Sequence, residues 1–91
     1  MYLKYYTKRF QKSFKKVLRA GKVSREEVEL VVDLLARGKK LSREYQDHSL
    51  HGSYENLREC HIRGDILLVY KIEKQKIVLV LFDIGAHSEL F

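Results

Sequence analysis

The sequence predicts an α+β sandwich in which two helices cover one face of a small antiparallel sheet. A tyrosine-rich stretch with strand composition opens the chain at residues 2–6. Two segments with apolar residues at helical spacing follow, and a glycine ends each of them. Three short apolar segments then come in succession, joined by turns too short to hold a helix. The predicted order is an N-terminal strand, a two-helix hairpin and a three-stranded antiparallel meander.

Both predicted helices carry start and stop signals. Thr7 is the expected N-cap of the first helix, and Gly21 ends it. Its apolar side is formed by Phe10, Phe14, Val17 and Leu18. Ser24 and Glu27 open the second helix as a capping box, in which each side chain satisfies a free backbone donor near the other. Gly38 stops this helix, and its buried stripe consists of Val28, Val31, Val32 and Leu35.

The meander strands are expected at residues 57–62, 66–72 and 77–82. The middle one is almost continuously apolar, which indicates a central strand buried on both faces. The turns at 63–65 and 73–76 are short enough for antiparallel hairpins. The helices then occupy one face of the sheet, and the other face is free to bind a partner.

Two segments outside these elements are expected to be functional. Residues 39–54 form a long connector with little periodicity that carries His48, His51 and Gly52. Residues 85–91 form a terminal segment, which Leu90 and Phe91 are apolar enough to anchor.

The length and the cysteine content limit the classes of protein to which this chain can belong. Ninety-one residues make a single domain, 1–91, near the lower end of chains that fold alone. A lone Cys60 cannot form an internal disulfide, which suits a reducing cytoplasm. We find no signal peptide and no apolar run near the ~20 residues that a membrane span needs, so no membrane partner is expected.

The charge distribution favours an anionic partner. The net charge is +6, and nine Lys or Arg residues fall between Lys4 and Arg25 without a single acid. A block of one sign on a folded element attracts phosphate backbones without reading sequence, and it also attracts acidic protein segments. The alternative interpretation is a solvated helix face.

The histidines suggest the chemistry. All four lie in the second half of the chain, and His48, His61 and His87 can converge with Asp65 on one edge of the free sheet face. RNA can be cut by its own 2′-hydroxyl when a base removes that proton and an acid protonates the departing 5′-oxygen. Histidine can serve in either role near neutral pH, and this reaction needs no metal or other cofactor. Each histidine taken alone would be read as an edge residue without a role.

Three further side chains are candidates for holding RNA. Arg58 and Arg63 can bind the scissile phosphate, although simple alternation puts Arg58 on the opposite face from His61. Phe91 can stack on a base. The alternative for Phe91 is a hydrophobic plug at the C-terminus.

A metal site is a weaker alternative. His48 and His51 have an i, i+3 spacing, and Cys60 with His61 adds two further ligand types. Structural zinc sites usually show two closely spaced pairs, such as Cys-x-x-Cys. We therefore expect Cys60 to pack in the core, and no metal is predicted.

Four stretches in order resemble the YafQ-type branch of the RelE toxin family. These are Asp47-His48-Ser49-Leu50-His51-Gly52, Arg58-Glu59-Cys60-His61-Ile62, Asp65 to Ile72 and Gly85-Ala86-His87-Ser88-Glu89-Leu90-Phe91. The resemblance covers essentially the whole chain. It implies a small RelE-like sandwich and a toxin of a bacterial type II toxin–antitoxin pair. It also implies an mRNA endonuclease acting on translating ribosomes, an acidic antitoxin that wraps the toxin, and contact with operator DNA only through the antitoxin complex.

The resemblance also suggests roles for the site residues. His48, His61, Asp65 and His87 match the branch's active-site positions, and Phe91 matches its terminal aromatic. His87 is expected as the general acid. Either His48 or Asp65 is expected as the base, with His61 orienting the phosphate.

The chain departs from the family pattern at three places. Ser49 replaces a frequent proline, Gly64-Asp65-Ile66 replaces Pro-Asp-Trp, and Asp83 stands where an arginine is common. The last change removes a cation from the site, for which Arg58, Arg63 or Lys71 would have to substitute.

A binding protein without catalysis is the competing hypothesis. The same fold carries ParE-group toxins that act on DNA gyrase, and a basic domain can also simply bind RNA. A pure binder does not need the histidine set, so replacing the histidines separates the two hypotheses.

Overall fold

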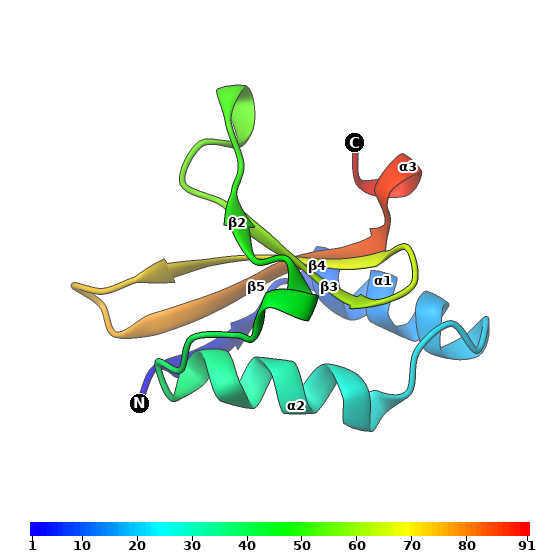
Figure 1. Cartoon of the computed structure of the whole chain (residues 1–91), viewed down its shortest axis with the longest axis horizontal. Coiled ribbons are helices and arrows are strands. Elements are labelled where there is room, and N and C mark those ends of the chain that lie inside the picture. Colours follow the sequence, from blue (N-terminus) through cyan, green and yellow to red (C-terminus); the bar gives the residue numbers. More distant parts are fainter.

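The computed structural model describes all 91 residues, and its main elements follow the predicted order (Figure 1). The helices and strands are β1 (Leu3–Tyr6), α1 (Lys8–Arg19), α2 (Arg25–Ala36), β2 (His48–Ser49), β3 (Arg58–Arg63), β4 (Ile66–Glu73), β5 (Val78–Ala86) and α3 (His87–Leu90). Two 3-10 turns, η1 (Arg43–Tyr45) and η2 (Gly52–Tyr54), lie within the connector. The α+β class is confirmed, with β2 and α3 as short additions.

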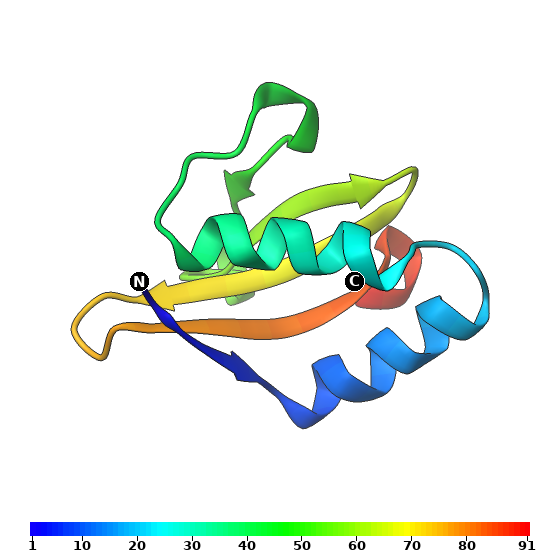
Figure 2. The same ribbon diagram turned by 90° about the horizontal axis from the view of Figure 1, so that it is seen from below.

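The five strands form one sheet in the order β1-β5-β4-β3-β2. β1 runs parallel to β5, and the other neighbours are antiparallel. β4 is therefore central, as its apolar sequence predicted. Both long helices lie beneath the sheet, and η2 and α3 rise above its opposite face (Figures 1 and 2). We call that opposite face the open face.

The predicted caps begin both helices. The Thr7 hydroxyl accepts a hydrogen bond from the backbone N–H of Phe10 at 2.9 Å. At α2, the Glu27 N–H donates to Ser24 Oγ at 3.1 Å, and the Ser24 N–H donates to Glu27 Oε1 at 2.8 Å. Gly21 and Gly38 follow the helix ends with φ of +69° and +73°, a conformation that glycine adopts without strain. None of the helices has the length and apolar composition that crossing a membrane requires.

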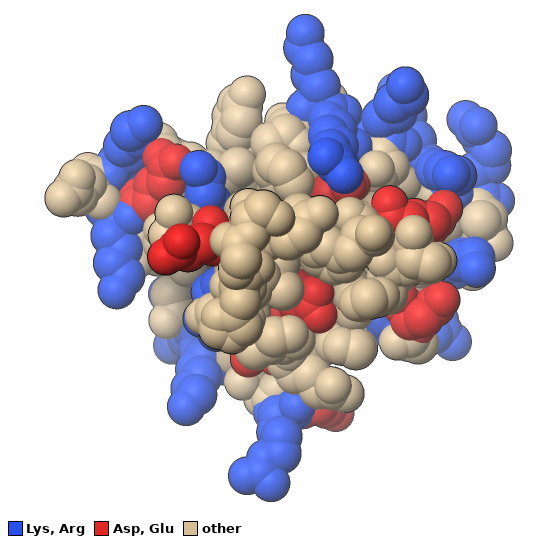
Figure 3. Space-filling view, turned by 90° about the horizontal axis from the view of Figure 1, so that it is seen from above, with Lys and Arg blue, Asp and Glu red and all other residues tan.

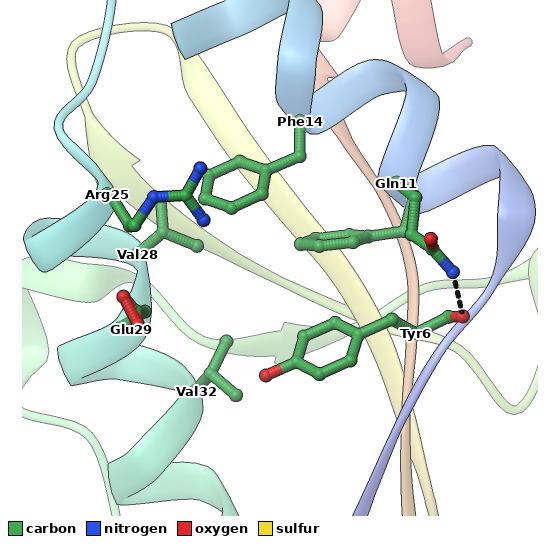
Figure 4. A pocket seen from close by; sticks show the side chains of 8 residues that line it. Tyr6, Gln11, Phe14, Arg25, Val28, Glu29 and Val32 are labelled. Carbon is green, nitrogen blue, oxygen red and sulfur yellow. Dashed lines mark hydrogen bonds between the residues drawn. The ribbon is translucent and has the colours of Figure 1, made fainter.

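The main core lies between the helices and the sheet. Phe10, Val31 and Leu35 pack there against Leu68 and Leu81 of the central strands. An open cavity of about 420 Å³ remains between the two helices; it is lined by aromatic and aliphatic side chains, with Arg25 lying over the Phe14 ring (Figure 4). This cavity is on the helical side of the sheet, away from the open face.

Part of the open face is also covered. Leu67 and Val69 of β4 form a second small cluster with Leu90 of α3, and Leu50 of the connector and Leu57, just before β3, pack against it. The expectation of an entirely free face is wrong, because a central apolar strand must be covered on both sides. The anchoring role predicted for Leu90 is confirmed.

The last strand differs from its predicted bounds. Ile77 has φ +56° and is 55% exposed, so it belongs to the turn and the strand begins at Val78. The strand continues to Ala86, so Asp83 to Ala86 lie in the sheet rather than in a terminal segment. A register shift opposite Val69 and Tyr70 leaves Phe82 as the extra residue of a β-bulge.

Candidate active site

The sheet register brings His61 and the start of α3 to the same end of the open face. His61, Leu67 and Gly85 form one row across β3, β4 and β5. Adjacent strands lie about 4.8 Å apart, so this row spans about 10 Å. His87 follows Gly85 by two residues and begins α3. Two histidines therefore flank a strip about one phosphodiester group wide, whose middle residue, Leu67, is packed against Leu90 of α3.

Gly85 packs against α3. A Cβ atom at this position would lie 3.6 Å from both the Glu89 carboxylate and a Leu90 methyl group, an ordinary van der Waals separation, so the packing of α3 does not require glycine here. The Ala86 N–H donates to Glu89 Oε1 at 3.2 Å, which closes the turn that directs His87 away from the strand. Glu89 also pairs with Lys16 at 3.2 Å. The Ala86 N–H and then Lys16 hold the pKa of Glu89 below its ordinary value.

Aromatic rings join the two segments that rise above the open face. The Phe91 ring lies 5.3 Å from the His87 ring and meets the Tyr54 ring edge to face at 4.9 Å. Phe91 nevertheless remains 43% exposed, so it is not a buried plug. Lys and Arg side chains stand around the rim of this face, with uncharged side chains and a few acids toward its middle (Figure 3). Such a rim attracts a polyanion to this face.

His48 is held from two sides. Its Nδ1 lies 2.6 Å from the Gln46 carbonyl oxygen, which can only accept, so this nitrogen carries the hydrogen. Its Nε2 lies 3.3 Å from the carboxylate of Glu59, its cross-strand neighbour, and can donate to that carboxylate when the ring is protonated. Glu59 is 6% exposed and shares a face of β3 with His61. We did not single out Glu59 from the sequence, although its two-residue spacing from His61 was the available signal.

Asp65 lies in the exposed turn between β3 and β4, at the end of the sheet where the His61 row lies. No hydrogen bond joins its carboxylate to His61. The structure therefore shows no direct contact by which Asp65 would orient His61. The role of Asp65 as the base stays a prediction.

Arg58 is engaged on the other face of β3. Its guanidinium donates to Ser49 Oγ at 2.8 Å, to Asp47 Oδ2 at 3.2 Å and to the Tyr70 hydroxyl at 3.3 Å. Tyr70 belongs to the core on the helical side, so the alternation rule holds and the predicted contact of Arg58 with substrate gains no support. Instead, Arg58 ties the connector, and with it β2, to the sheet.

The other two predicted cations are not gathered at the histidines. Arg63 pairs with Glu27 of α2 at 3.5 Å. Lys71 pairs with Glu73 at 3.0 Å, near the β4–β5 turn and away from the His61 end of β4. Their contact with RNA stays a prediction.

The ligands of the alternative metal site do not converge. Cys60 packs in the core on the helical side of β3, whereas its neighbour His61 points to the open face. Burial raises the pKa of the Cys60 thiol to about 12, so the thiolate that binds metals is suppressed. No group of three or more His, Cys, Asp and Glu side chains is arranged as a metal site.

The sequence of the whole chain identifies its family. Residues 2–91 match the family model described as the bacterial toxin YafQ of type II toxin–antitoxin systems. The chain belongs to the YafQ family. Its fold is that of the solved YafQ structures, as the resemblance implied.

Named relatives in this family have the same fold. The "mRNA interferase toxin YafQ" of Escherichia coli K12 is 38% identical over 48 residues, which are 52% of this chain and 49% of that protein. The chain thus spans about half the length of that curated relative. A metal-bound toxin from Helicobacter pylori is 40% identical, with both chains covered completely and a TM-score of 0.93. YafQ in the E. coli DinJ–YafQ complex is 25% identical over 100% of this chain and 99% of its own, with a TM-score of 0.88.

Within this YafQ-family chain, the departure at residue 83 has a structural counterpart. Asp83 is buried and pairs through its Oδ2 with Arg9 Nε at 2.7 Å. Two further cations of the basic N-terminal block are paired as well, Lys4 with Asp33 at 2.9 Å and Lys16 with Glu89. The block is therefore less strongly charged in the fold than in the sequence.

Proposed function

We propose that this chain is an endoribonuclease that cuts mRNA on translating ribosomes. The cut is made by attack of a 2′-hydroxyl on the adjacent phosphate. His87 donates the proton to the departing 5′-oxygen. His48 or Asp65 accepts the proton of the 2′-hydroxyl, and His61 orients the phosphate. The 2′-oxygen forms a bond to phosphorus while the bond to the 5′-oxygen breaks, which leaves a 2′,3′-cyclic phosphate and a 5′-hydroxyl.

The observation that carries this proposal is the row of His61, Leu67 and Gly85, with His87 two residues beyond it. His61 and His87 stand at the two ends of this row, so a phosphate that binds between them can be oriented by His61 while His87 protonates its departing 5′-oxygen. Positioning the nucleotide between them contributes at least as much as either proton transfer, each of which typically gives about 10²–10⁴-fold. The aromatic pair of Phe91 and Tyr54 beside His87 supplies rings on which a base can stack.

The proposed reaction draws its acid and base from side chains, so it requires no metal. The Helicobacter pylori relative is described as metal-bound, which makes chelation a necessary control. Cleavage by this chain should proceed in EDTA and leave the cyclic phosphate. A 3′-hydroxyl product that requires a divalent ion would contradict the mechanism.

We also propose that the chain is neutralised by an acidic antitoxin and meets operator DNA only as part of that complex. The E. coli complex of DinJ and YafQ supports a protein partner for the family fold. The unpaired cations of α1, such as Lys8, Lys12 and Lys15, are exposed and suit an acidic segment that orders on binding.

The deciding experiment is inducible expression in bacteria with mapping of mRNA 5′ ends, comparing the wild type with His87→Ala. We expect growth arrest and cuts within translated reading frames from the wild type, and a loss of at least about 100-fold in cutting from the variant. His51→Ala is the matched control, since His51 is exposed and lies outside the His61 row. It should cut like the wild type.

Two other outcomes would change the proposed function. Arrest by all three proteins without mRNA cuts would favour a binding toxin, either of the gyrase-directed kind or one that occupies RNA without cutting it. Cuts in untranslated as well as translated RNA would remove the ribosome from the proposal while keeping the chemistry.

A further inference from the structure

The bulge in β5 directs two neighbouring side chains to one edge of the open face. Phe82 and Asp83 together oppose a single residue of β4, so both side chains point to the same side of the strand. β1 covers the outer edge of β5 only as far as Leu81, the partner of Tyr6. The edge beyond Leu81 is therefore left to the first turn of α1.

Arg9 occupies this edge in a fixed arrangement. Its Nε donates to Asp83 Oδ2 at 2.7 Å, and its guanidinium carbon lies 5.3 Å from the centre of the Phe82 ring. Thr7 secures the turn that carries Arg9, because its hydroxyl donates to the Phe82 carbonyl at 2.8 Å. Asp83 is held in turn by the Ile84 N–H at 2.8 Å.

The guanidinium remains available for a ligand despite this pairing. The Arg9 side chain is 56% exposed, whereas that of Asp83 is 5% exposed. The bond to Asp83 uses Nε and leaves the two terminal amino groups of the guanidinium for an incoming anion. Two such groups match two oxygens of a phosphate, and an arginine already oriented by a carboxylate and a ring loses less conformational freedom when it binds.

The surroundings of Arg9 connect it to the proposed acid. A cavity of about 190 Å³ is lined by Arg9, Ser13 and Lys16 from α1, Asp83 from β5 and Glu89 from α3. The helix α3 that closes this cavity begins with His87. Arg9 therefore lies beside the helix that begins with the proposed acid.

We propose that Arg9, positioned by Asp83 and Phe82, binds an RNA backbone phosphate adjacent to the one that is cut. This inference rests on the proposed ribonuclease function. Arg9 supplies a binding contact for the substrate, and Asp83 is a positioning residue that acts through Arg9. A purely structural pair that only fastens α1 to β5 is the competing explanation.

Binding is measured with a labelled single-stranded RNA of mixed sequence that carries 2′-O-methyl groups throughout, because this probe lacks the nucleophile and cannot be cut. Fluorescence anisotropy is recorded at several salt concentrations. We expect Arg9→Gln to weaken binding about tenfold. The slope of log K against log salt should fall by about 0.7, the value for one phosphate contact on a single strand. Arg37→Gln is the matched control, because Arg37 also pairs with a carboxylate, Asp33, but lies at the end of α2.

A second variant keeps the test informative if Arg9→Gln is unstable. Arg9→Lys retains the charge but loses the paired amino groups, so it should keep most of the salt slope and lose part of the affinity. Thermal unfolding of each variant separates folding from binding. The inference is overturned if both Arg9 variants bind the probe like the wild type, or if Arg37→Gln weakens binding equally.

The same proteins distinguish this inference from the proposed function. His87→Ala should bind the uncut probe like the wild type while losing cleavage of mRNA. A wild type that never cuts mRNA would remove the proposed function. A wild type that cuts, together with an Arg9→Gln variant that binds and cuts equally well, would remove only the role of Arg9.

Discussion

Replacing Tyr70 by phenylalanine tests whether a buried polar network holds the connector that carries His48. The Tyr70 side chain is 1% exposed, and its hydroxyl donates to Asp47 Oδ1 at 2.5 Å while accepting from Arg58 Nε. Asp47 immediately precedes His48, and Arg58 reaches Ser49 on the other side of it. Removing one oxygen atom therefore takes a partner from both charged groups without creating a large cavity.

The expected loss of stability follows from these contacts. A hydrogen bond to a charged group contributes about 1.5–3 kcal/mol. Asp47 retains its bond to Arg58, and its side chain is 21% exposed, so water can replace part of what is lost. We therefore expect the low end, about 1.5–2 kcal/mol. With a urea dependence of about 1 kcal/mol per molar, the unfolding midpoint should fall by about 1.5–2 M.

Urea unfolding followed by circular dichroism measures this change. Tyr5→Phe is the control, because Tyr5 is 58% exposed and its hydroxyl makes no bond within the chain; it should leave the midpoint unchanged. A double-mutant cycle with Asp47→Ala should give a coupling energy of about 1 kcal/mol or more. A Tyr70→Phe protein within 0.5 kcal/mol of the wild type would refute the view that this network holds the connector, since changes of that size are typical of surface substitutions.

Two further predictions concern pH and salt. Burial raises the pKa of Cys60 to about 12 and also raises that of Tyr70, where the bond to Asp47 adds to the effect. Both groups ionise more readily in the unfolded chain, so the free energy of unfolding should fall as pH rises above about 9, by up to about 1.4 kcal/mol per pH unit for each group; urea midpoints that stay constant from pH 9 to 11 would contradict this. Association with the antitoxin co-purified from the native host should slow at least about tenfold between 0.05 and 0.5 M NaCl, because the exposed cations of α1 steer an acidic segment. Stopped-flow rates that are independent of salt would exclude electrostatic steering.

The elements that local sequence determines were predictable. The capping box of α2 depends on residues three apart, and the central position of β4 follows from its continuous apolar run. The two residues of β2 were not predictable, because nothing in their own composition distinguishes them from a loop and their pairing depends on β3. Ile77 misled the prediction because a β-branched residue is unusual at positive φ, yet the turn requires it there.

The site was predictable only where alternation along one strand sufficed. His61 and Arg58 lie on opposite faces of β3, as a period of two requires. The contact of Glu59 with His48 depends on how β2, a part of the irregular connector, pairs with β3. Nothing in the sequence of the connector indicates which of its residues pairs with Glu59. The pair of Arg9 and Asp83 joins residues 74 positions apart across a bulge, and neither residue alone indicates the other.

The bulge at Phe82 explains why the two ends of β5 serve different purposes. Before the bulge, Leu79 and Leu81 face the helical core; after it, Ile84 and Ala86 do so. An unbroken alternation would have turned Asp83 into the core and Ile84 onto the open face, since a shift of one residue exchanges the faces of a strand. The extra residue thus puts Asp83 and Gly85 on the open face, where Asp83 meets Arg9 and Gly85 packs against α3. The contact between Asp83 and Arg9 is a consequence of this bulge, one of two irregularities in the sheet; the other lies between His61 and Arg63 of β3.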